Sequence, residues 1–577
     1  MARAAVAVGL ASLNQWPASV VTAQSDAGTP VAASPDSAND ELSLPAGITL
    51  AASPPSTQGK PTLGGALKLV RPGTTIDQFN PAAFRQDPQI PLSYLEPLVR
   101  PDPATLRPMP WLAERWAWRD DGLSLAFTLR DGVVWHDGAP LSAADAQFSF
   151  QLYQDDVESA IGSLFALVEA VEVASDRDLL VRFRERDANW LFNAATLPVV
   201  SVRQYGQYWD ALPATARTIS GFDWRESLPV GTGPWRVTAF DDRQVAFARF
   251  DDYWQRVTWL DTLEISLEEG RRNRLGAWES GTSQIAWPVR MANLESLNDP
   301  EGTLYDVPAA SVMFAAFNFA NPAQPSGSLW SDLRVRQAAS LAIDRERYAN
   351  EVFGGAIRWD AAGTVSQPWA NDLSLMTPAH NPEVAAILLD EAGWIDYDGD
   401  GVREDFNGWQ LRPVAILRED SRPELAAVLA RVARDFANVG MALTIESLPA
   451  EAFADRWISR RDYDLIAYAY DQLPGFTDFD LYGSAWDIRT NPAGWNPGGY
   501  ANADADAAIN DFLAAVSIER QASALARLQR VVDEDLFGLW LGFPRDLVLV
   551  AAGIEGFAPD MAWQTARTGN LWSAHDS

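Results

Sequence analysis

One acidic segment of the chain has the residue types and the spacing of a cation-binding loop. Its carboxylates stand at loop positions one, three, five and nine, with Gly at position six, and they belong to Asp396, Asp398, Asp400 and Glu404. Calcium takes about six to eight oxygen ligands, and an EF-hand loop supplies many of them from alternate positions in this way. The segment therefore predicts a calcium site formed by these four residues.

Two positions of this loop differ from the EF-hand pattern. Asn407 stands at position twelve, where a bidentate Glu is expected, and Arg403 replaces a residue that is usually apolar. A solvated turn of Asp and Gly residues is the alternative interpretation. Because the loop follows the end of an expected helix, we expect any bound calcium to be structural, and the sequence indicates no required cofactor.

The residue types that most often carry catalysis are scarce. The chain has no cysteine, which excludes disulfides, thiol catalysis and thiolate metal sites. Its three histidines, His136, His380 and His575, lie far apart in the sequence and do not suggest a metal site or a catalytic triad. The many acidic residues leave a pair of carboxylates for glycoside hydrolysis open, but no particular pair is indicated. We therefore expect no enzyme, with a secreted glycoside hydrolase as the less favoured alternative.

The glycine-rich segment 229–237 is not a phosphate-binding loop. Gly231 and Gly233 flank Thr232, which indicates a sharp turn before a strand that begins at Trp235. A phosphate-binding loop would instead continue into Lys-Ser/Thr and a helix.

Length, composition and charge limit the class of protein. A chain of 577 residues with 47% hydrophobic residues is long enough for about three lobes with ordinary cores. The formal net charge is −32, from 77 acidic and 45 basic residues, and such a chain is a poor partner for nucleic acids and anionic lipids. We expect no nucleic-acid binding and no direct insertion into a membrane.

The N-terminal region is predicted to lie outside the folded core. Residues 1–23 resemble a signal peptide, with Arg3, an apolar run over 4–13 and small residues at 21–23 as a cleavage site. The apolar run is too short to span a bilayer, and a merely disordered N-terminus is the alternative. Residues 24–62 are rich in Ala, Ser, Pro, Asp and Thr and are predicted to be a disordered linker.

The best-defined elements form a hairpin followed by a helix. Residues 116–118 and 123–129 are predicted strands, and the second alternates Leu and Phe with smaller or polar residues. Gly122 supplies the turn between them. Ser142 and Asp145 have the spacing of a capping box, which predicts that a helix begins there.

The order of residues in 111–150 resembles the signature segment of the family 5 extracytoplasmic solute-binding proteins, the dipeptide- and oligopeptide-binding receptors of ABC importers. The matching positions are Leu112-Ala113-Glu114, Trp116, Asp121-Gly122, Phe127, Leu129-Arg130, Gly132-Val133, His136-Asp137-Gly138, Pro140 and Ala144-Asp145. Residues 94–99, 229–237, 250–254 and 332–345 resemble further motifs of the family. The resemblance covers about 65–560, nearly all of the chain that we expect to fold.

This resemblance implies an α/β fold of the periplasmic-binding-protein-like type II class (cluster C), with two lobes and an extra subdomain around a central cleft. Lobe I would comprise 63–105, 225–312 and 542–577, the extra subdomain 106–224, and lobe II 313–541.

Two sets of strands are predicted within these lobes. In lobe II, strands and helices alternate, which predicts a mainly parallel sheet; they span 415–417, 424–439, 442–445, 450–460 and 464–470. The closing strands, 539–543 and 547–550, are both expected to return to lobe I.

The resemblance also implies that the protein binds a ligand and catalyses no reaction on it. The two lobes would close on the ligand, and the closed form would present it to the permease of an ABC importer. The protein would be a monomer outside the cytoplasm, in the periplasm or on the outer face of the membrane. Peptides are the expected ligands, and oligosaccharides or other small solutes are the alternative.

Nine residues are predicted to contact the ligand: Tyr94, Glu96, Phe317, Asn318, Trp369, Tyr470, Asp471, Trp486 and Trp495. In peptide-binding relatives, an Asp three residues after a strand-ending aromatic pairs with the α-ammonium of the peptide. Tyr470 takes the aromatic place, but the third residue after it is Leu473, so Asp471 is the candidate. A buried ammonium without a carboxylate partner is costly, so either Asp471 has this role or the ligand is not a classical peptide.

The three tryptophans of this set have two interpretations. Trp369, Trp486 and Trp495 lie in predicted loops, where their rings would stack on a ligand such as a sugar. Packing in the core or on the surface is equally consistent with the sequence.

Overall fold

The computed structural model divides the chain into two compact units. One contains residues 309–545 (the 309–545 unit), and the other contains 5–308 together with 546–577 (the discontinuous unit). The structure describes residues 44–51, 61–72, 76, 79–83, 90–103, 105–119, 122–159, 161–255, 258–268, 271–298, 300–307, 311–323, 329–360, 368–370, 372, 374–471, 479–491, 494–496, 498–558 and 571–573. The predicted signal peptide, 1–23, lies outside the described residues.

The 309–545 unit is built on a six-stranded mixed sheet with the order β17-β21-β16-β20-β18-β19. Its strands are β16 (Ser311–Phe317), β17 (Ile357–Arg358), β18 (Val414–Arg418), β19 (Thr444–Leu448), β20 (Leu465–Asp471) and β21 (Gly538–Pro544). β18 pairs in parallel with β19 and with β20, so the predicted βαβ run is confirmed. The expectation of a mainly parallel sheet is wrong, because the other three strand pairings of this sheet are antiparallel. β16 is antiparallel to both of its neighbours, β20 and β21.

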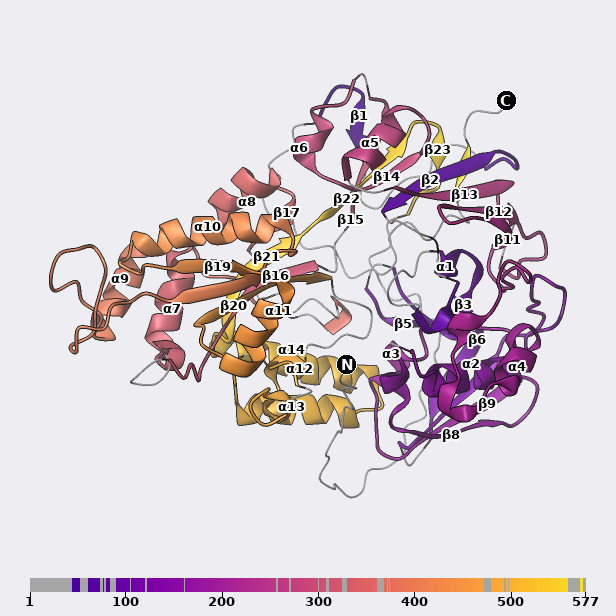
Figure 1. Ribbon diagram of the computed structural model, residues 1–577, viewed down its shortest axis with the longest axis horizontal. Coiled ribbons are helices and arrows are strands. Elements are labelled where there is room, and N and C mark those ends of the chain that lie inside the picture. The colour runs from indigo at the N-terminus through magenta and orange to yellow at the C-terminus, as the bar shows by residue number, and fades with distance from the viewer. Residues whose placement is uncertain are drawn as a thin grey trace. The chain divides into compact units, whose positions relative to one another are not determined.

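Helices cover both faces of this sheet (Figure 1). On one face lie α7 (Leu333–Ala342), α8 (Arg345–Phe353), α9 (Pro382–Glu391) and α10 (Pro423–Ala437), and on the other lie α11 (Ala450–Ala454), α12 (Phe479–Tyr482), α13 (Ala503–Ala514) and α14 (Ile518–Glu534). Successive side chains of a strand point to opposite faces. Accordingly, Met313 and Phe317 of β16 join the first core, and Phe314 joins the second.

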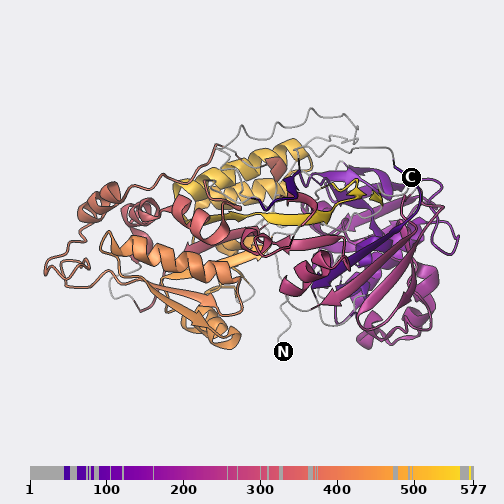
Figure 2. The same cartoon turned by 90° about the horizontal axis from the view of Figure 1, so that it is seen from above.

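The discontinuous unit contains an eight-stranded sheet with the order β1-β15-β22-β14-β2-β13-β12-β11. Its strands are β1 (Ile48–Leu50), β2 (Ala66–Pro72), β11 (Trp235–Phe240), β12 (Gln244–Arg249), β13 (Thr262–Glu268), β14 (Ile285–Val289), β15 (Gly302–Val307) and β22 (Asp546–Ala551). β2 pairs in parallel with β13, with Leu67 opposite Leu263. Figure 2 shows β2 in indigo beside the magenta strands of this sheet.

A second sheet of the same unit carries the predicted hairpin. Its order is β6-β7-β9-β8, from β6 (Ala113–Trp118), β7 (Ser124–Leu129), β8 (Val168–Val173) and β9 (Asp178–Phe183). The helix that follows the hairpin is α2 (Ala143–Asp155), and the backbone N–H of Ser142 donates to Oδ2 of Asp145 at 2.9 Å. The hairpin and the capping box are therefore confirmed.

The remaining elements are short or connect these layers. In the discontinuous unit they are α1 (Pro91–Tyr94), β3 (Glu96–Pro97), β4 (Val99–Pro101), β5 (Pro108–Pro110), α3 (Trp190–Asn193), β10 (Pro198–Val199), α4 (Val202–Ala211), α5 (Arg271–Glu279), α6 (Met291–Leu294), β23 (Ile554–Glu555) and β24 (Trp572–Ser573). Among the described residues, none of the helices combines the length and the apolar character needed to cross a membrane.

Two further predictions from the sequence are wrong. The region 24–62 is not a disordered linker throughout, because β1 pairs in parallel with β15, with Ile48 opposite Gly302, and the Ile48 side chain is buried. The closing strands do not both return to lobe I, because β21 pairs with β16 and β17 in the 309–545 unit, and only β22 joins the eight-stranded sheet.

Candidate functional site

The carboxylate of Glu96 is the centre of a buried polar cluster in the discontinuous unit. Oε1 accepts hydrogen bonds from Nε1 of Trp111 and from the hydroxyl of Tyr253, each at 2.8 Å. Oε2 accepts from Oγ1 of Thr232 at 2.8 Å and from Nε1 of Trp254 at 2.9 Å. A carboxylate has about four acceptor positions, and these four donors occupy them.

The four donors of this cluster come from distant parts of the chain. Trp111 precedes the hairpin, Thr232 lies in the glycine-rich turn, and Tyr253 and Trp254 follow β12. Burial raises the pKa of Glu96, and the four hydrogen bonds act in the opposite direction. The Glu96 side chain therefore links four of the five segments that resemble family motifs.

The glycine-rich turn passes against the backbone of Tyr94. The N–H of Gly233 donates to the carbonyl oxygen of Tyr94 at 2.9 Å. A Cβ atom on Gly231 would lie 1.7 Å from that oxygen, and one on Gly233 would lie 2.9 Å from it. The two glycines are thus required by the close approach of two backbone segments.

His136 is fixed in one tautomer by the same turn. Its Nδ1 accepts the N–H of Gly231 at 3.2 Å, so Nε2 carries the proton and donates to the carbonyl oxygen of Gly233 at 2.9 Å. Burial is the main cause that lowers the pKa of His136 to about 4. His136 is therefore a neutral structural residue that joins the hairpin to the turn.

The contacts of Tyr94 and Glu96, both predicted ligand residues, lie within their own unit. Both side chains are buried, and the ring of Tyr94 packs near Phe79 with centroids 6.0 Å apart. No comparison tests a ligand contact at either residue, so that role stays a prediction.

Phe317 and Asn318 are embedded in the 309–545 unit. The ring of Phe317 packs against Trp330 with centroids 4.3 Å apart. Nδ2 of Asn318 donates to the carbonyl oxygens of Arg461 at 2.9 Å and Tyr463 at 2.8 Å. Its Oδ1 accepts the N–H of Ala320 at 3.1 Å. Asn318 therefore joins the end of β16 to the segment before β20, and a ligand contact at either residue stays a prediction.

Tyr470, which takes the aromatic place, and Asp471, the candidate partner of the α-ammonium, lie at the end of β20. The backbone of Tyr470 is opposite Val312, and that of Asp471 is opposite Ser311 of β16. The placement of their side chains, and the whole of the following segment 472–478, lies outside the described residues.

The predicted tryptophans differ in exposure. Trp495 is 52% exposed, and its ring packs on that of Trp457 with centroids 5.2 Å apart. Trp486 is half-buried in a 3₁₀ turn, and Trp369 packs in part against the core that contains α13 and α14. Of the three, Trp495 has the largest free surface for stacking.

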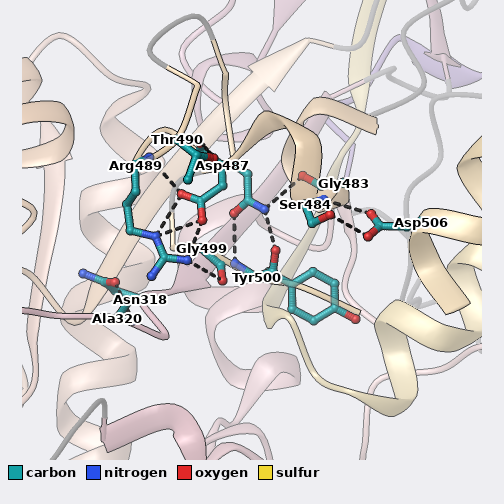
Figure 3. Close-up of polar contacts among 11 residues, drawn as sticks. Asn318, Ala320, Gly483, Ser484, Asp487, Arg489, Thr490, Gly499, Tyr500 and Asp506 are labelled. Carbon is teal, nitrogen blue, oxygen red and sulfur yellow. Dashed lines mark hydrogen bonds and ion pairs between the residues drawn. The ribbon is translucent and has the colours of Figure 1, made fainter. Parts of the chain in front are cut away.

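A polar network holds the loop that carries Trp486 and Trp495 (Figure 3). The guanidinium of Arg489 pairs with Asp487 and donates to the carbonyl oxygen of Gly499 at 3.3 Å. Ser484 is bound to the carboxylate of Asp506, through its N–H at 2.9 Å and its hydroxyl at 2.6 Å. The loop is therefore anchored on the first turn of α13.

Three of the four predicted calcium ligands lie together. Carboxylate oxygens of Asp396, Asp398 and Glu404 all lie within 4.8 Å of one another. Asp400 is not in this group. Its oxygens accept the N–H of Val402 at 2.7 Å and Nε2 of Gln410 at 3.0 Å.

The sequence did not assign the four donors around Glu96. All four lie in or beside segments that resemble family motifs, but nothing in their spacing shows that they converge on one carboxylate. The signal in the sequence is chemical: these segments contain two indoles, a phenol and a hydroxyl that can each donate a hydrogen bond, but it does not identify their shared acceptor.

The structural comparison shows that this chain has the fold of solved solute-binding proteins. The oligopeptide-binding protein AppA from Bacillus subtilis, solved in complex with a nonapeptide, matches with a TM-score of 0.64 and 20% identity, over 89% of this chain and 100% of that chain. The fold class predicted from the sequence is confirmed.

The particular family follows from the sequence comparison. This chain belongs to the bacterial extracellular solute-binding proteins, family 5, whose model matches residues 107–491. The probable di/tripeptide-binding protein 5 of Pseudomonas aeruginosa is 27% identical over 472 residues, 78% of this chain and 84% of that protein. Heme-binding protein A of Haemophilus influenzae is 26% identical over 445 residues, 73% of this chain and 76% of that protein.

Proposed function

We propose that this protein is the extracytoplasmic ligand-binding component of an ABC importer and that its ligands are peptides. The observation that carries the proposal is the family match over 107–491, together with relatives named for peptide binding over most of their length. The signal-peptide pattern of residues 1–23 supports a location outside the cytoplasm. The protein acts as a monomer that delivers its ligand to a membrane permease.

The mechanism is capture by closure of the two units on the ligand, without a chemical step. Closure removes the charged ends of a peptide from water, so each end needs a partner of opposite charge. Asp471, at the end of β20, supplies the carboxylate for the α-ammonium. Ligand binding shifts the population towards the closed form, and that form is the one recognised by the permease.

Calorimetry with matched peptides tests this proposal. Short peptides with a free N-terminus are expected to bind, and the Asp471→Asn variant should lose at least about tenfold in affinity for them because a buried charge pair is broken. N-acetylated forms of the same peptides should bind both proteins equally. The Asp420→Asn variant, which removes an exposed carboxylate of the same unit, should behave as the unchanged protein.

Three results of this experiment would contradict the proposal. If Asp471→Asn lost affinity equally for free and acetylated peptides, Asp471 would not be the residue that binds the α-ammonium. Binding of oligosaccharides or heme in place of peptides would change the ligand class, and the half-exposed ring of Trp495 would then be the first stacking surface to test. Recovery of a cleaved peptide after binding would show that this protein is an enzyme.

A further inference from the structure

We propose that the loop 396–404 of the 309–545 unit binds one calcium ion through the carboxylates of Asp396, Asp398 and Glu404. The loop connects the end of α9 to β18, and it is closed by an antiparallel bridge between Ile395 and Glu404. None of these three residues is among those predicted to contact the transported ligand, and the calcium ion is a structural metal.

Glu404 is the observation that points to an ion. Its side chain is only 7% exposed, and Oε1 accepts the N–H of Tyr397 at 2.8 Å. Oε2 is buried and has no hydrogen-bond partner among the described residues. A desolvated carboxylate oxygen without a partner costs free energy, and a cation held between Glu404 and the two Asp residues removes that cost.

The charges around the three carboxylates favour the same conclusion. Three carboxylates within 4.8 Å of one another repel unless a positive charge lies among them. Arg403 does not supply it, because its guanidinium pairs with Asp390 and donates to the carbonyl oxygens of Val439 at 2.8 Å and Trp394 at 2.6 Å. The substitution of the usual apolar residue by arginine is therefore compatible with a cation in the loop.

Backbone donors orient the first ligand of the loop. The N–H of Gly399 donates to Oδ1 of Asp396 at 2.7 Å, and the N–H of Gly401 donates to Oδ2 at 3.1 Å. Both glycines have positive φ, of 79° and 87°, which a side chain would disfavour. The carboxylate of Asp396 is thus held in place before the ion binds.

The donor set favours calcium over other common ions. All the donors are oxygens, which excludes a preference for zinc or copper. Calcium accepts an irregular shell of about six to eight oxygens, whereas magnesium requires an octahedron and keeps several waters. A surface depression lined by Asp398, Glu404, Gln410 and Arg412, among others, leaves room for water ligands beside the carboxylates. Nε of Arg412 donates to Oε1 of Gln410 at 2.7 Å.

Calcium titration of the full-length chain after treatment with EDTA tests the site. Calorimetry with calcium chloride should show one ion per chain, and calcium should raise the thermal unfolding temperature by several degrees over EDTA, since the ion binds only the folded loop. Asp398→Asn and Glu404→Gln should each weaken calcium binding by at least about tenfold. Asp176→Asn, an exposed charge-matched control in the other unit, should leave the affinity unchanged.

The proposal is overturned if calcium and EDTA give the same unfolding temperature, or if Glu404→Gln binds calcium as tightly as the unchanged protein. Equal affinity for magnesium would overturn the choice of ion. Asp398 is exposed, so its variant keeps the fold and the test remains decisive if Glu404→Gln fails to fold. All readouts use calcium alone, so they are independent of whether the protein binds peptides.

Discussion

At the scale of single residues, the most informative side chain is Glu96. Its carboxylate accepts four hydrogen bonds, two from indoles and two from hydroxyls. The indoles can only donate, whereas the hydroxyls can also accept. The indoles of Trp111 and Trp254 bind different oxygens of the carboxylate. A group with two acceptor oxygens is therefore needed at this position.

Replacing Glu96 by Gln tests this requirement. The amide nitrogen of Gln replaces one oxygen, so either Trp111 or Trp254 faces a donor and loses its acceptor. We expect Glu96→Gln to lower the free energy of unfolding by about 1–3 kcal/mol. Urea denaturation measures the change, with Glu172→Gln on the exposed end of β8 as a control that shifts stability little. A Glu96→Gln variant as stable as the control would show that the cluster does not need the carboxylate.

His136 makes the stability of the discontinuous unit depend on pH. The pKa of His136 is about 4 in the folded chain, below its ordinary value of 6.5, so the unfolded chain binds the extra proton between these two values. The stabilisation that comes from neutral His136 is fully present above pH 6.5 and is lost as the pH falls towards 4.

The variant His136→Gln isolates this effect. A glutamine amide can accept from the N–H of Gly231 and donate to the carbonyl of Gly233, as the imidazole does, but it does not titrate. Between pH 7 and pH 5, the unchanged protein should lose about 2 kcal/mol more than the variant. Urea unfolding at the two pH values gives the comparison, and parallel losses in the two proteins would assign the pH dependence to other groups.

At the scale of elements, the turn before β11 is the most constrained. The Cβ of an alanine at Gly231 would lie 1.7 Å from a backbone oxygen, so the two crossing segments would have to separate. We expect Gly231→Ala to destabilise the protein by at least about 2 kcal/mol.

A second glycine provides a control substitution whose expected effect on stability is opposite. Gly276 is exposed within α5, and a Cβ there would meet no atom within 4 Å. Gly276→Ala should raise stability by about 0.5–1 kcal/mol, because alanine favours a helix. Chemical denaturation of both variants gives the comparison, and an equal effect of the two substitutions would contradict the close crossing at Tyr94.

The sequence predicted those elements whose pattern is local. In β7 the buried Leu125, Phe127 and Leu129 alternate with half-buried Ala126 and Thr128, as the period of two requires. β1 was missed because a strand of three residues has too few positions to show any period, and it depends on its partner β15 for its hydrogen bonds. Contacts such as those of Glu96 could not be predicted, since they join segments far apart in the chain.

At the scale of the whole molecule, the chain passes between the two units at 308/309 and at 545/546. Strands β21 and β22 are separated only by Arg545, yet they belong to different sheets. Successive strands are usually neighbours in one sheet, so a sequence pattern assigns both to the same lobe. This is the physical reason why the prediction for 539–543 was wrong.

The closed shell of donors around Glu96 also limits what family membership can reveal. Side chains of these motif segments hydrogen-bond to Glu96, so these contacts support the shared fold and do not by themselves select a ligand. Two proteins alike in every one of these signatures can therefore transport unlike molecules. The ligand specificity of this protein is therefore expected to depend on side chains other than the four donors of Glu96.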